Sequence, residues 1–372
     1  MPQVLIVGAG ITGLCTAWAL ARGGVGVTVV EKGPVPCPTA ASADHHRLIR
    51  RAYPAQPGYA LRTADAFAAW ERLFADLPRP RGHYFADNGI LSLSLHPGDR
   101  GDRVRRSYDR LAIPYEAVDG RAALAERFPF LETRNLAGGV VSAGGALMAN
   151  RILTDLADHL RARGVQVLEH SPVAAVEPQA PAVRLADGRH LTADRVIVAA
   201  GAGAPGLMPA QAGDLGYRRT LIAYATPPKD LADAWEGAPC WSGLGAPGEL
   251  WGMSPVHGLP LKLGCGALGR IDPDDSDRTP TAAEIDGIFG FYRGLFRGIE
   301  RFTLRFAQAN FWMLAAEEKF VLRAEGGCLL LSADSGHGFK FGPLTGEDVA
   351  EAALGAMPVA EVAARMAAPD PV

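Results

Sequence analysis

The chain has 372 residues, which is enough for a large hydrophobic core and two domains, since domains typically hold roughly 100–200 residues. Its 37 lysines and arginines nearly balance its 40 aspartates and glutamates, so it lacks the positive field of a general nucleic-acid binder. The five cysteines lie far apart without a CxxC pair, which argues against a disulfide framework or a zinc site and favours a reducing compartment.

The first apolar run, residues 4–20, contains three glycines and is shorter than the roughly 20 residues that a membrane-spanning helix needs. No basic region precedes it, as a secretory signal would require. We therefore expect no membrane association and a location in the cytoplasm.

Residues 3–30 predict the βαβ order of a nucleotide-binding unit. Residues 3–8 form a short apolar run rich in β-branched side chains, as expected of a strand buried on both faces. Apolar residues recur at helical spacing over 14–21, two glycines end this helix, and residues 25–30 form a second strand. An α/β fold with a parallel sheet is the expected result.

The turn between the first strand and the helix has the motif GAGITG at 8–13. Gly8 allows the tight turn, Gly10 lets the backbone approach a pyrophosphate, and Gly13 lets the helix and strand pack closely. Glu31 closes the second strand, where an acid accepts hydrogen bonds from ribose hydroxyls. This acid fits NAD or FAD and disfavours NADP, but the unit alone does not choose between the first two.

Three later segments continue the α/β pattern. Residues 148–176 predict a helix that ends at Gly164, followed by strands, and residues 182–193 predict a hairpin around Asp187-Gly188. An apolar strand at 194–203 ends in a turn of small residues. Residues 328–354 predict a strand, a glycine-rich loop and a helix.

The motif GHGFKF at 336–341, together with RLIRRAY at 47–53, closely resembles the monomeric sarcosine oxidase branch of the D-amino acid oxidase superfamily. N-methyltryptophan oxidase and pipecolate oxidase belong to the same branch. Residues 88–91, 138–150 and 261–264 match further segments of this family in chain order.

The resemblance implies an α/β fold with two domains. The first is a Rossmann-type, glutathione-reductase-like FAD-binding domain, and the second is a substrate domain built on an antiparallel sheet. We expect the FAD-binding domain to comprise residues 1–80, 145–215 and 320–372, and the substrate domain to comprise residues 81–144 and 216–319.

The resemblance also assigns roles to four cations. Arg50 and Lys340 match the residues that bind the substrate carboxylate, and a planar guanidinium with a compact ammonium suits that anion. Arg47 matches an arginine beside the flavin, and Lys262 matches a lysine that promotes reaction with oxygen. Three of them have a structural alternative: Arg50 on the surface, Lys340 packed at a helix start, and Lys262 pointing from its strand to solvent.

The predicted substrate pocket departs from the family. Trp251 and Trp312 stand where the family has tyrosines, and Gly266 stands where it has a histidine; Met253 and His337 are further expected lining residues. These changes favour a bulkier or cyclic amino acid over sarcosine. Asn310 aligns with the cysteine that carries the flavin covalently in monomeric sarcosine oxidase, so we expect FAD to bind non-covalently.

The stretch ADHHRLIRRAY at 43–53 is expected to form a loop and a helix that face the flavin. Adjacent histidines rarely bind a metal unaided, and we predict no metal site here. One of His45 and His46 is expected to approach the flavin, but the sequence does not decide which. The complete set of expected cofactor contacts is Gly8, Gly10, Ile11, Thr12, Gly13, Glu31, Lys32, His45, His46, Arg47, Val173, Ala200, Gly201, Gly336, His337, Gly338, Phe339 and Lys340.

The resemblance therefore implies an FAD-dependent oxidase that converts the C–N bond of an α-amino or α-imino acid to an imine and reduces O2 to H2O2. A secondary or cyclic amine is the favoured substrate. Two alternatives stay open: a dehydrogenase that passes electrons to a quinone or a protein, and a non-catalytic flavin-binding protein. We expect no nucleic-acid partner, and the sequence does not indicate an oligomeric state.

Overall fold

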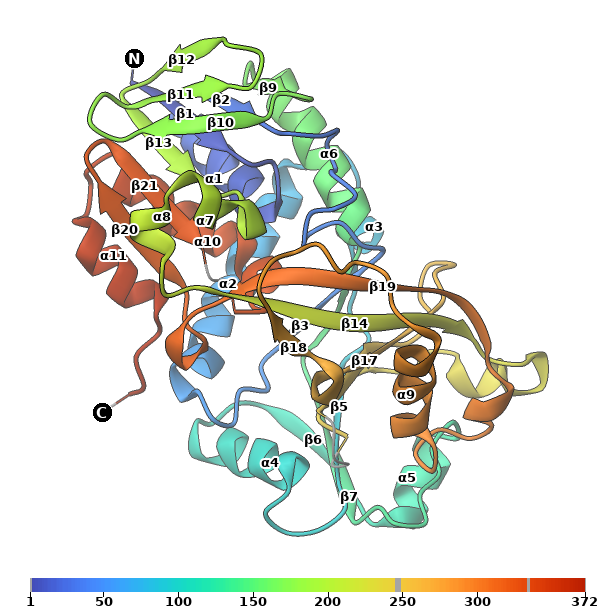
Figure 1. The fold of residues 1–372 in the computed structure, drawn as a ribbon. Helices are drawn as coiled ribbons and strands as arrows, with labels where there is room; N and C mark the ends of the chain where they lie inside the picture. The colour runs from blue at the N-terminus through green and yellow to red at the C-terminus, as the bar shows by residue number, and fades with distance from the viewer. Residues whose placement is uncertain (1, 245–248, 333–334, 372) are drawn as a thin grey trace.

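The computed structural model describes residues 2–244, 249–332 and 335–371, which form two large sheets and two small ones (Figure 1). The first large sheet has six strands in the order β20-β21-β13-β1-β2-β9. All neighbours are parallel except β20 and β21. The strands are β1 (Gln3–Val7), β2 (Gly26–Val30), β9 (Gln166–Leu168), β13 (Arg195–Val198), β20 (Val321–Glu325) and β21 (Cys328–Ser332).

Side chains on this sheet alternate between two covering layers, as the period of a strand requires. Val4 and Ile6 of β1 pack with helices in one hydrophobic cluster, whereas Leu5 and Val7 pack in another with the small sheet β10-β11-β12. The helices are α1 (Ile11–Arg22), α2 (Pro57–Asp76), α6 (Ala149–Ala162), α10 (Gly338–Ala353) and α11 (Val359–Met366). The second layer consists of β10 (Val173–Glu177), β11 (Ala182–Leu185), β12 (His190–Thr192), α7 (Ala204–Leu207) and α8 (Pro209–Ala212).

Glycines hold the first strand and helix in close contact. Gly8 has a φ of +106°, and a Cβ there would lie 2.5 Å from the Ala199 carbonyl oxygen. A Cβ on Gly13 would lie only 1.9 Å from the Gly8 carbonyl oxygen. Neither position has room for a side chain. Gly8 thus makes the tight turn at its positive φ, and Gly13 lets the helix and strand pack closely, as predicted.

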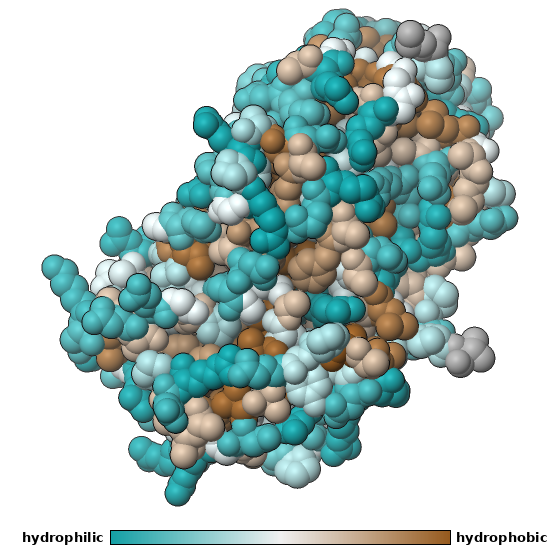
Figure 2. Space-filling view, turned by 180° about the vertical axis from the view of Figure 1, so that it is seen from behind, coloured by the Kyte–Doolittle hydropathy of each residue, from teal (hydrophilic) through white to brown (hydrophobic). Residues whose placement is uncertain are grey.

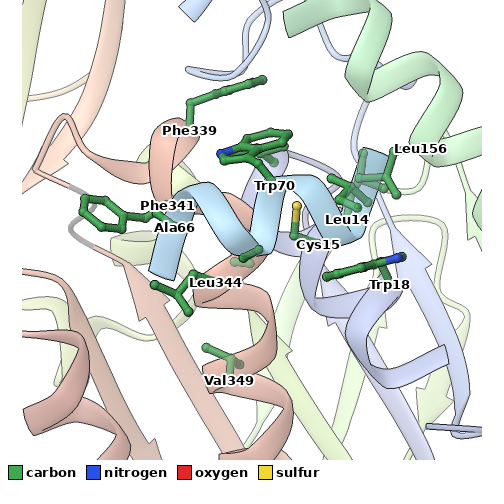
Figure 3. Packing of buried hydrophobic residues seen from close by; sticks show 14 of the residues in the cluster. Leu14, Cys15, Trp18, Ala66, Trp70, Leu156, Phe339, Phe341, Leu344 and Val349 are labelled. Carbon is green, nitrogen blue, oxygen red and sulfur yellow. The ribbon is translucent and has the colours of Figure 1, made fainter. Parts of the chain in front are cut away.

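Helix α10 packs directly on α1 (Figure 3). A Cβ on Gly342 would lie 2.7 Å from a side-chain carbon of Ile11, and one on Gly346 would lie 2.5 Å from the Cys15 carbonyl oxygen. At the start of α10, the Trp70 indole donates a hydrogen bond of 2.9 Å to the Lys340 carbonyl oxygen. This packing holds the GFKF motif beside the start of α1.

The second large sheet has nine strands in the order β18-β14-β17-β16-β15-β5-β7-β6, with β19 also paired to β14. The long strands β14 (Gly216–Thr226) and β19 (Thr303–Leu314) cross the middle of the molecule (Figure 1). The remaining strands are β5 (Ile90–Ser94), β6 (Tyr115–Asp119), β7 (Gly138–Ser142), β15 (Cys240–Ser242), β16 (Leu250–Met253), β17 (Leu261–Cys265) and β18 (Arg270–Asp272).

This sheet is antiparallel, as expected, except where β15 runs parallel to β5. Its core is a hydrophobic cluster separate from that of the six-stranded sheet. The helices α3 (Arg81–Tyr84), α4 (Arg100–Arg110), α5 (Arg121–Arg127) and α9 (Ala282–Tyr292) complete the chain. The two-domain, mixed α/β architecture matches the expected fold class, while the domain limits at residues 80, 144, 215 and 319 stay a prediction.

Residues 47–50 correct one expectation, because they form strand β3 (Arg47–Arg50) and not a helix. This strand pairs antiparallel with β8 (Gly144–Leu147), which also pairs with β4 (Phe85–Ala86). The pairing gives hydrogen-bond partners to the backbone groups of β3, and the following helix begins only at Pro57.

Charged and polar residues cover much of the face in Figure 2, with hydrophobic residues in scattered groups between them. Within the described ranges, none of the helices has both the length and the apolar character needed to cross a membrane.

Candidate active site

A cavity of about 400 Å³ lies where the start of α1, strand β3 and the start of α10 meet strands β14, β16 and β19. Segments that are far apart in the sequence thus form one wall, with Asn310 and Gly266 among its residues. The predicted site residues that line it are Ile11, Arg47, Arg50, Trp251, Met253, Trp312, Gly336, His337, Gly338, Phe339 and Lys340.

Two of the predicted cations converge on one aromatic ring. The Arg50 guanidinium carbon lies 4.4 Å from the centroid of the Tyr53 ring, and the Lys340 ammonium nitrogen lies 5.8 Å from it. Arg50 also donates to the Ala52 carbonyl, and Lys340 donates to the Gly336 carbonyl oxygen at 2.9 Å. Two cations held together by backbone groups and a π-face offer a site for a carboxylate.

His337 is buried beside these cations in a defined protonation state. Its Nε2 lies 3.1 Å from the Glu318 carbonyl oxygen, which can only accept, so Nε2 carries the proton. Nδ1 then accepts a hydrogen bond of 3.0 Å from the Tyr53 hydroxyl. Burial, together with Lys340 and Arg50, holds the pKa of His337 well below its usual range, so the ring is neutral and adds no charge to the cavity.

Lys262 lies on β17 and is completely buried, so the alternative of a strand lysine in solvent is wrong. Its ammonium nitrogen is 2.5 Å from Oδ2 of Asp44 and 3.1 Å from the His46 carbonyl oxygen. It also lies 5.6 Å and 5.5 Å from the ring centroids of Tyr224 and Trp251. Burial lowers the pKa of Lys262, and the Asp44 carboxylate opposes this effect.

Asp44 is the residue that sequence reasoning missed at this point. Its carboxylate accepts hydrogen bonds from Arg47, Lys262 and the Tyr224 hydroxyl. Burial would raise the pKa of Asp44, but Arg47 and Lys262 outweigh it and hold the pKa well below its usual range. No local motif marks Asp44, because its partner Lys262 is distant in the sequence.

The adjacent histidines differ in their surroundings. His46 is completely buried and stacks on Tyr224 at 5.6 Å, and neither ring nitrogen has a hydrogen-bond partner among the described residues. Burial and the Lys262 charge lower the pKa of His46 to about 3. His45 meets Tyr224 and Phe306 edge-on, at 5.2 Å and 5.4 Å. Because neither histidine lines the cavity, which of them approaches a cofactor stays open.

The start of α1 has the features of a pyrophosphate site. Gly8 and Gly13 exclude side chains, and the Ile11 amide donates a hydrogen bond of 2.9 Å to the Ser42 hydroxyl. Glu31 is buried, and its carboxylate accepts from the Ala9 amide at 2.8 Å and the Gly33 amide at 3.3 Å. A glycine cradle with a buried acid at the end of the second strand fits a dinucleotide cofactor.

The other predicted cofactor contacts differ in how close they lie to this glycine cradle. Thr12 accepts a hydrogen bond from the Thr16 hydroxyl within α1. Ala200 lies against Gly8, since a Cβ built on Gly8 would be 3.1 Å from the Ala200 Cα. The Ser171 amide donates to the Glu31 carbonyl oxygen, and this contact brings the strand that begins at Val173 close to Glu31. Gly201 and Lys32 are exposed.

The indoles and glycines of the nine-stranded sheet shape the rest of the cavity. The Trp312 indole donates to the Thr220 hydroxyl at 2.9 Å. Trp251 lies over Gly264, where a Cβ would come within 2.4 Å of its ring. A Cβ on Gly266 would be 2.8 Å from Oε2 of Glu249, so this carboxylate fills the space beside Gly266. Sequence reasoning did not single out Thr220, Glu249 or Tyr53.

Replacing Asp44 with asparagine is expected to lower the free energy of unfolding by about 3–5 kcal/mol, because it leaves the buried Lys262 charge without its counter-charge. The double variant Asp44→Asn/Lys262→Met should recover part of this loss. Urea unfolding measures both, and Asp230→Asn, which alters an exposed pair with Arg301, is a control with little expected effect. A loss below about 1 kcal/mol for Asp44→Asn would contradict the buried pair.

The stability of the protein is expected to fall as the pH drops below about 6.5, the ordinary pKa of a histidine. In the unfolded chain His46 takes up a proton there, whereas in the folded state it stays neutral down to a pH of about 3. Below this pH, His46 alone lowers the free energy of unfolding by about 1.4 kcal/mol for each pH unit. Urea unfolding between pH 7.5 and 5.5 should show a smaller pH slope in His46→Asn than in the unmodified protein. An unchanged slope in His46→Asn would mean that His46 titrates normally.

Comparison with known proteins identifies the family of this chain. The chain matches the model of the family described as FAD dependent oxidoreductase over residues 3–352. It is 24% identical to peroxisomal sarcosine oxidase of Mus musculus, covering 95% of this chain and 92% of that protein. It is 25% identical to N-methyl-L-tryptophan oxidase of Salmonella newport (strain SL254), covering 96% and 95%.

Two solved structures share the fold. Fructosyl amine:oxygen oxidoreductase (Amadoriase I) from Aspergillus fumigatus superposes with a TM-score of 0.78 at 20% identity, covering 95% of this chain and 86% of that chain. L-proline dehydrogenase from P. horikoshii superposes with a TM-score of 0.81 at 18% identity, covering 96% and 95%. Because the family match spans nearly the whole chain, the protein belongs to the FAD-dependent oxidoreductases of the D-amino acid oxidase type.

Proposed function

We propose that the protein oxidises the C–N bond of an α-amino or α-imino acid to an imine, with FAD as a non-covalent cofactor and O2 as the electron acceptor. A secondary or cyclic amine is the favoured substrate, and the cytoplasm is the proposed compartment. The relatives named for sarcosine, N-methyl-L-tryptophan and proline support an amine of this type.

The observation that carries this proposal is the convergence of Arg50 and Lys340 over the Tyr53 ring. We assign these two cations to the substrate carboxylate. Held there, the substrate extends toward Trp251, Met253 and Trp312, which line the same cavity. His337 is neutral and is already hydrogen-bonded on both nitrogens, so we assign it a role in fixing Tyr53 rather than in moving a proton.

We assign FAD to the start of α1 and to the part of the cavity wall next to it. The cradle at Gly8, Gly10 and Gly13 would hold the pyrophosphate, and Glu31 would accept from the ribose. Arg47 and the start of α10 line the cavity where the ring system would lie. Non-covalent binding is supported because all five cysteines are buried and none of them lines this cavity. When bound, FAD accepts a hydride equivalent from the carbon next to the substrate nitrogen and passes the electrons to the acceptor.

The protein's own part is orientation and electrostatics. Arg50 and Lys340 fix the carboxylate, and the indoles exclude water from the reacting carbon. An amine that binds in its neutral form needs no strong general base. Lys262 is assigned to the reaction with oxygen, since a fixed ammonium stabilises superoxide as it forms.

One observation favours a second candidate, a dehydrogenase that uses a quinone or a protein as acceptor. The Lys262 ammonium is 2.5 Å from the Asp44 carboxylate, so its charge is already offset. A neutralised ion pair stabilises superoxide less than an isolated ammonium does. The two candidates share the same substrate half-reaction and differ only in the acceptor.

The proposed function is tested by mixing the FAD-loaded protein without oxygen with sarcosine, proline, pipecolate and N-methyl and D-amino acids. At least one of these amines is expected to bleach the flavin absorbance near 450 nm, roughly the band of oxidised flavin. Admitting oxygen should then restore the absorbance within seconds and release peroxide in equal amount. If no amine bleaches the flavin, the proposed function is wrong; if recovery takes minutes and an added quinone speeds it, the dehydrogenase is correct.

Arg50→Ala is expected to raise the KM for the substrate by roughly 10- to 100-fold, because it removes a charged hydrogen-bond donor to the carboxylate. The neighbouring Arg51→Ala is the matched control, since Arg51 donates to the Thr63 hydroxyl and does not line the cavity. Steady-state kinetics and the FAD absorbance spectrum measure the effect. An unchanged KM, or a loss of bound FAD, would remove Arg50 from the substrate site.

A further inference from the structure

Arg100 lines the same cavity on the side of the nine-stranded sheet, and it has no role in the proposed function. It is the first residue of α4, whose start is fixed by Asp99: the carboxylate accepts from the backbone amides of Asp102 at 2.9 Å and Leu95 at 2.6 Å. The Arg100 side chain passes over Gly243, where a Cβ would lie 2.9 Å from its Cδ. Gly243 therefore leaves the space that this side chain occupies.

This position is electrostatically unfavourable for a cation. The N-terminus of a helix carries a partial positive charge, which disfavours an arginine at the first position. Burial, and then the nearby Arg50, lower the pKa of Arg100. Its Nε is buried and has no hydrogen-bond partner among the described residues. The helix N-terminus, burial and Arg50 all disfavour the positive charge of Arg100, so an anion that enters the cavity would stabilise it.

Two further arginines on the cavity wall have other partners. Among the described residues, Arg47 pairs with the buried Asp44 carboxylate, and Arg218 donates to the neutral Gly266 carbonyl oxygen at 3.3 Å. Among the described residues, the ion pair of Arg100 is a contact of 3.4 Å to Glu249, whose side chain is 70% exposed. An exposed pair of this kind contributes little and is readily exchanged for another carboxylate.

We propose that Arg100 binds a second anionic group of the substrate, so that the enzyme acts on an amino or imino acid with two carboxylates. This inference rests on the proposed function, in which Arg50 and Lys340 hold the first carboxylate. Arg100 binds the second carboxylate and so determines substrate specificity. The reacting carbon lies between the two carboxylates. The Glu249 carboxylate gives up Arg100 when the substrate enters.

The second carboxylate has two possible chemical sources, a side chain or the substituent on nitrogen. N-methyl-L-aspartate represents the first source and iminodiacetate the second. N-methyl-L-asparagine is the neutral isostere of N-methyl-L-aspartate, because it replaces only the second carboxylate with an amide. Sarcosine is the corresponding reference for iminodiacetate, because it lacks the second carboxylate altogether.

The experiment compares kcat/KM for these two pairs by anaerobic flavin reduction. The dicarboxylate of at least one pair is expected to exceed its partner by about tenfold or more, as a charge-assisted hydrogen bond provides. The pair that shows the preference identifies the source of the second carboxylate. Binding without turnover is measured with thiodiacetate and methylthioacetate, where sulfur replaces the amine nitrogen, through the change in flavin absorbance on titration.

Arg100→Gln should lower kcat/KM for the preferred dicarboxylate about tenfold and change the value for its monocarboxylate partner less than about twofold. It should also remove the preference for thiodiacetate over methylthioacetate. The matched control is Arg103→Gln on the same helix, which contacts the Gly98 carbonyl and does not line the cavity. Retained FAD absorbance and an unchanged urea midpoint show that each variant is folded.

The inference is overturned if neither pair shows a preference for the dicarboxylate, or if Arg100→Gln lowers both members of a pair equally. Sarcosine or N-methyl-L-asparagine would then still bleach the flavin, and the proposed function would stand without a second anion site. If no compound in either set bleaches the flavin, the proposed function fails and the inference falls with it.

Discussion

The buried contact between Asp44 and Lys262 joins the two halves of the molecule. Asp44 follows the nucleotide-binding unit, whereas Lys262 belongs to the centre of the nine-stranded sheet. Both side chains are almost completely removed from water, so each charge depends on the other and on Arg47 for its stability. Because the pair permits little displacement, it fixes how the sheet carrying the indoles faces the start of α1.

A second constraint comes from the packing of α10 on α1. Two glycines of α10 leave space for Ile11 and Cys15, and this close approach brings Lys340 to the cavity wall. Tyr53 then lies close to both Lys340 and Arg50, and its hydroxyl donates to His337, whose tautomer is set by the Glu318 carbonyl. The proposed carboxylate site therefore depends on backbone packing at small residues and on the aromatic ring that both cations contact.

The charges in and beside the cavity have different surroundings, which supports the proposed roles for cofactor, substrate and acceptor. Arg47 and Lys262 are offset by Asp44. His46 beside Lys262, and His337 beside Lys340 and Arg50, stay neutral because burial lowers the pKa of each ring. The positive charge proposed to face the substrate thus comes from cations that contact backbone carbonyls and an aromatic ring. In such a cavity the anionic groups of a ligand determine its orientation before any chemistry takes place.

The amino-acid sequence by itself determined the elements whose signals are local. The βαβ unit follows from apolar periodicity and three glycines, and the family resemblance followed from short motifs such as GFKF. The order of these motifs also indicated that Arg50, Lys340 and Trp312 belong to one site, and the structure places all three on one cavity.

The tertiary structure decided the pairings between distant segments. It made residues 47–50 a strand, because β8 supplies partners for their backbone groups, and it buried Lys262 against Asp44. It also brought Arg100 beside Arg50, although the sequence places them on different elements. The physical reason is that local patterns record backbone sterics and periodicity, whereas the partner of a buried charge depends on how whole elements pack.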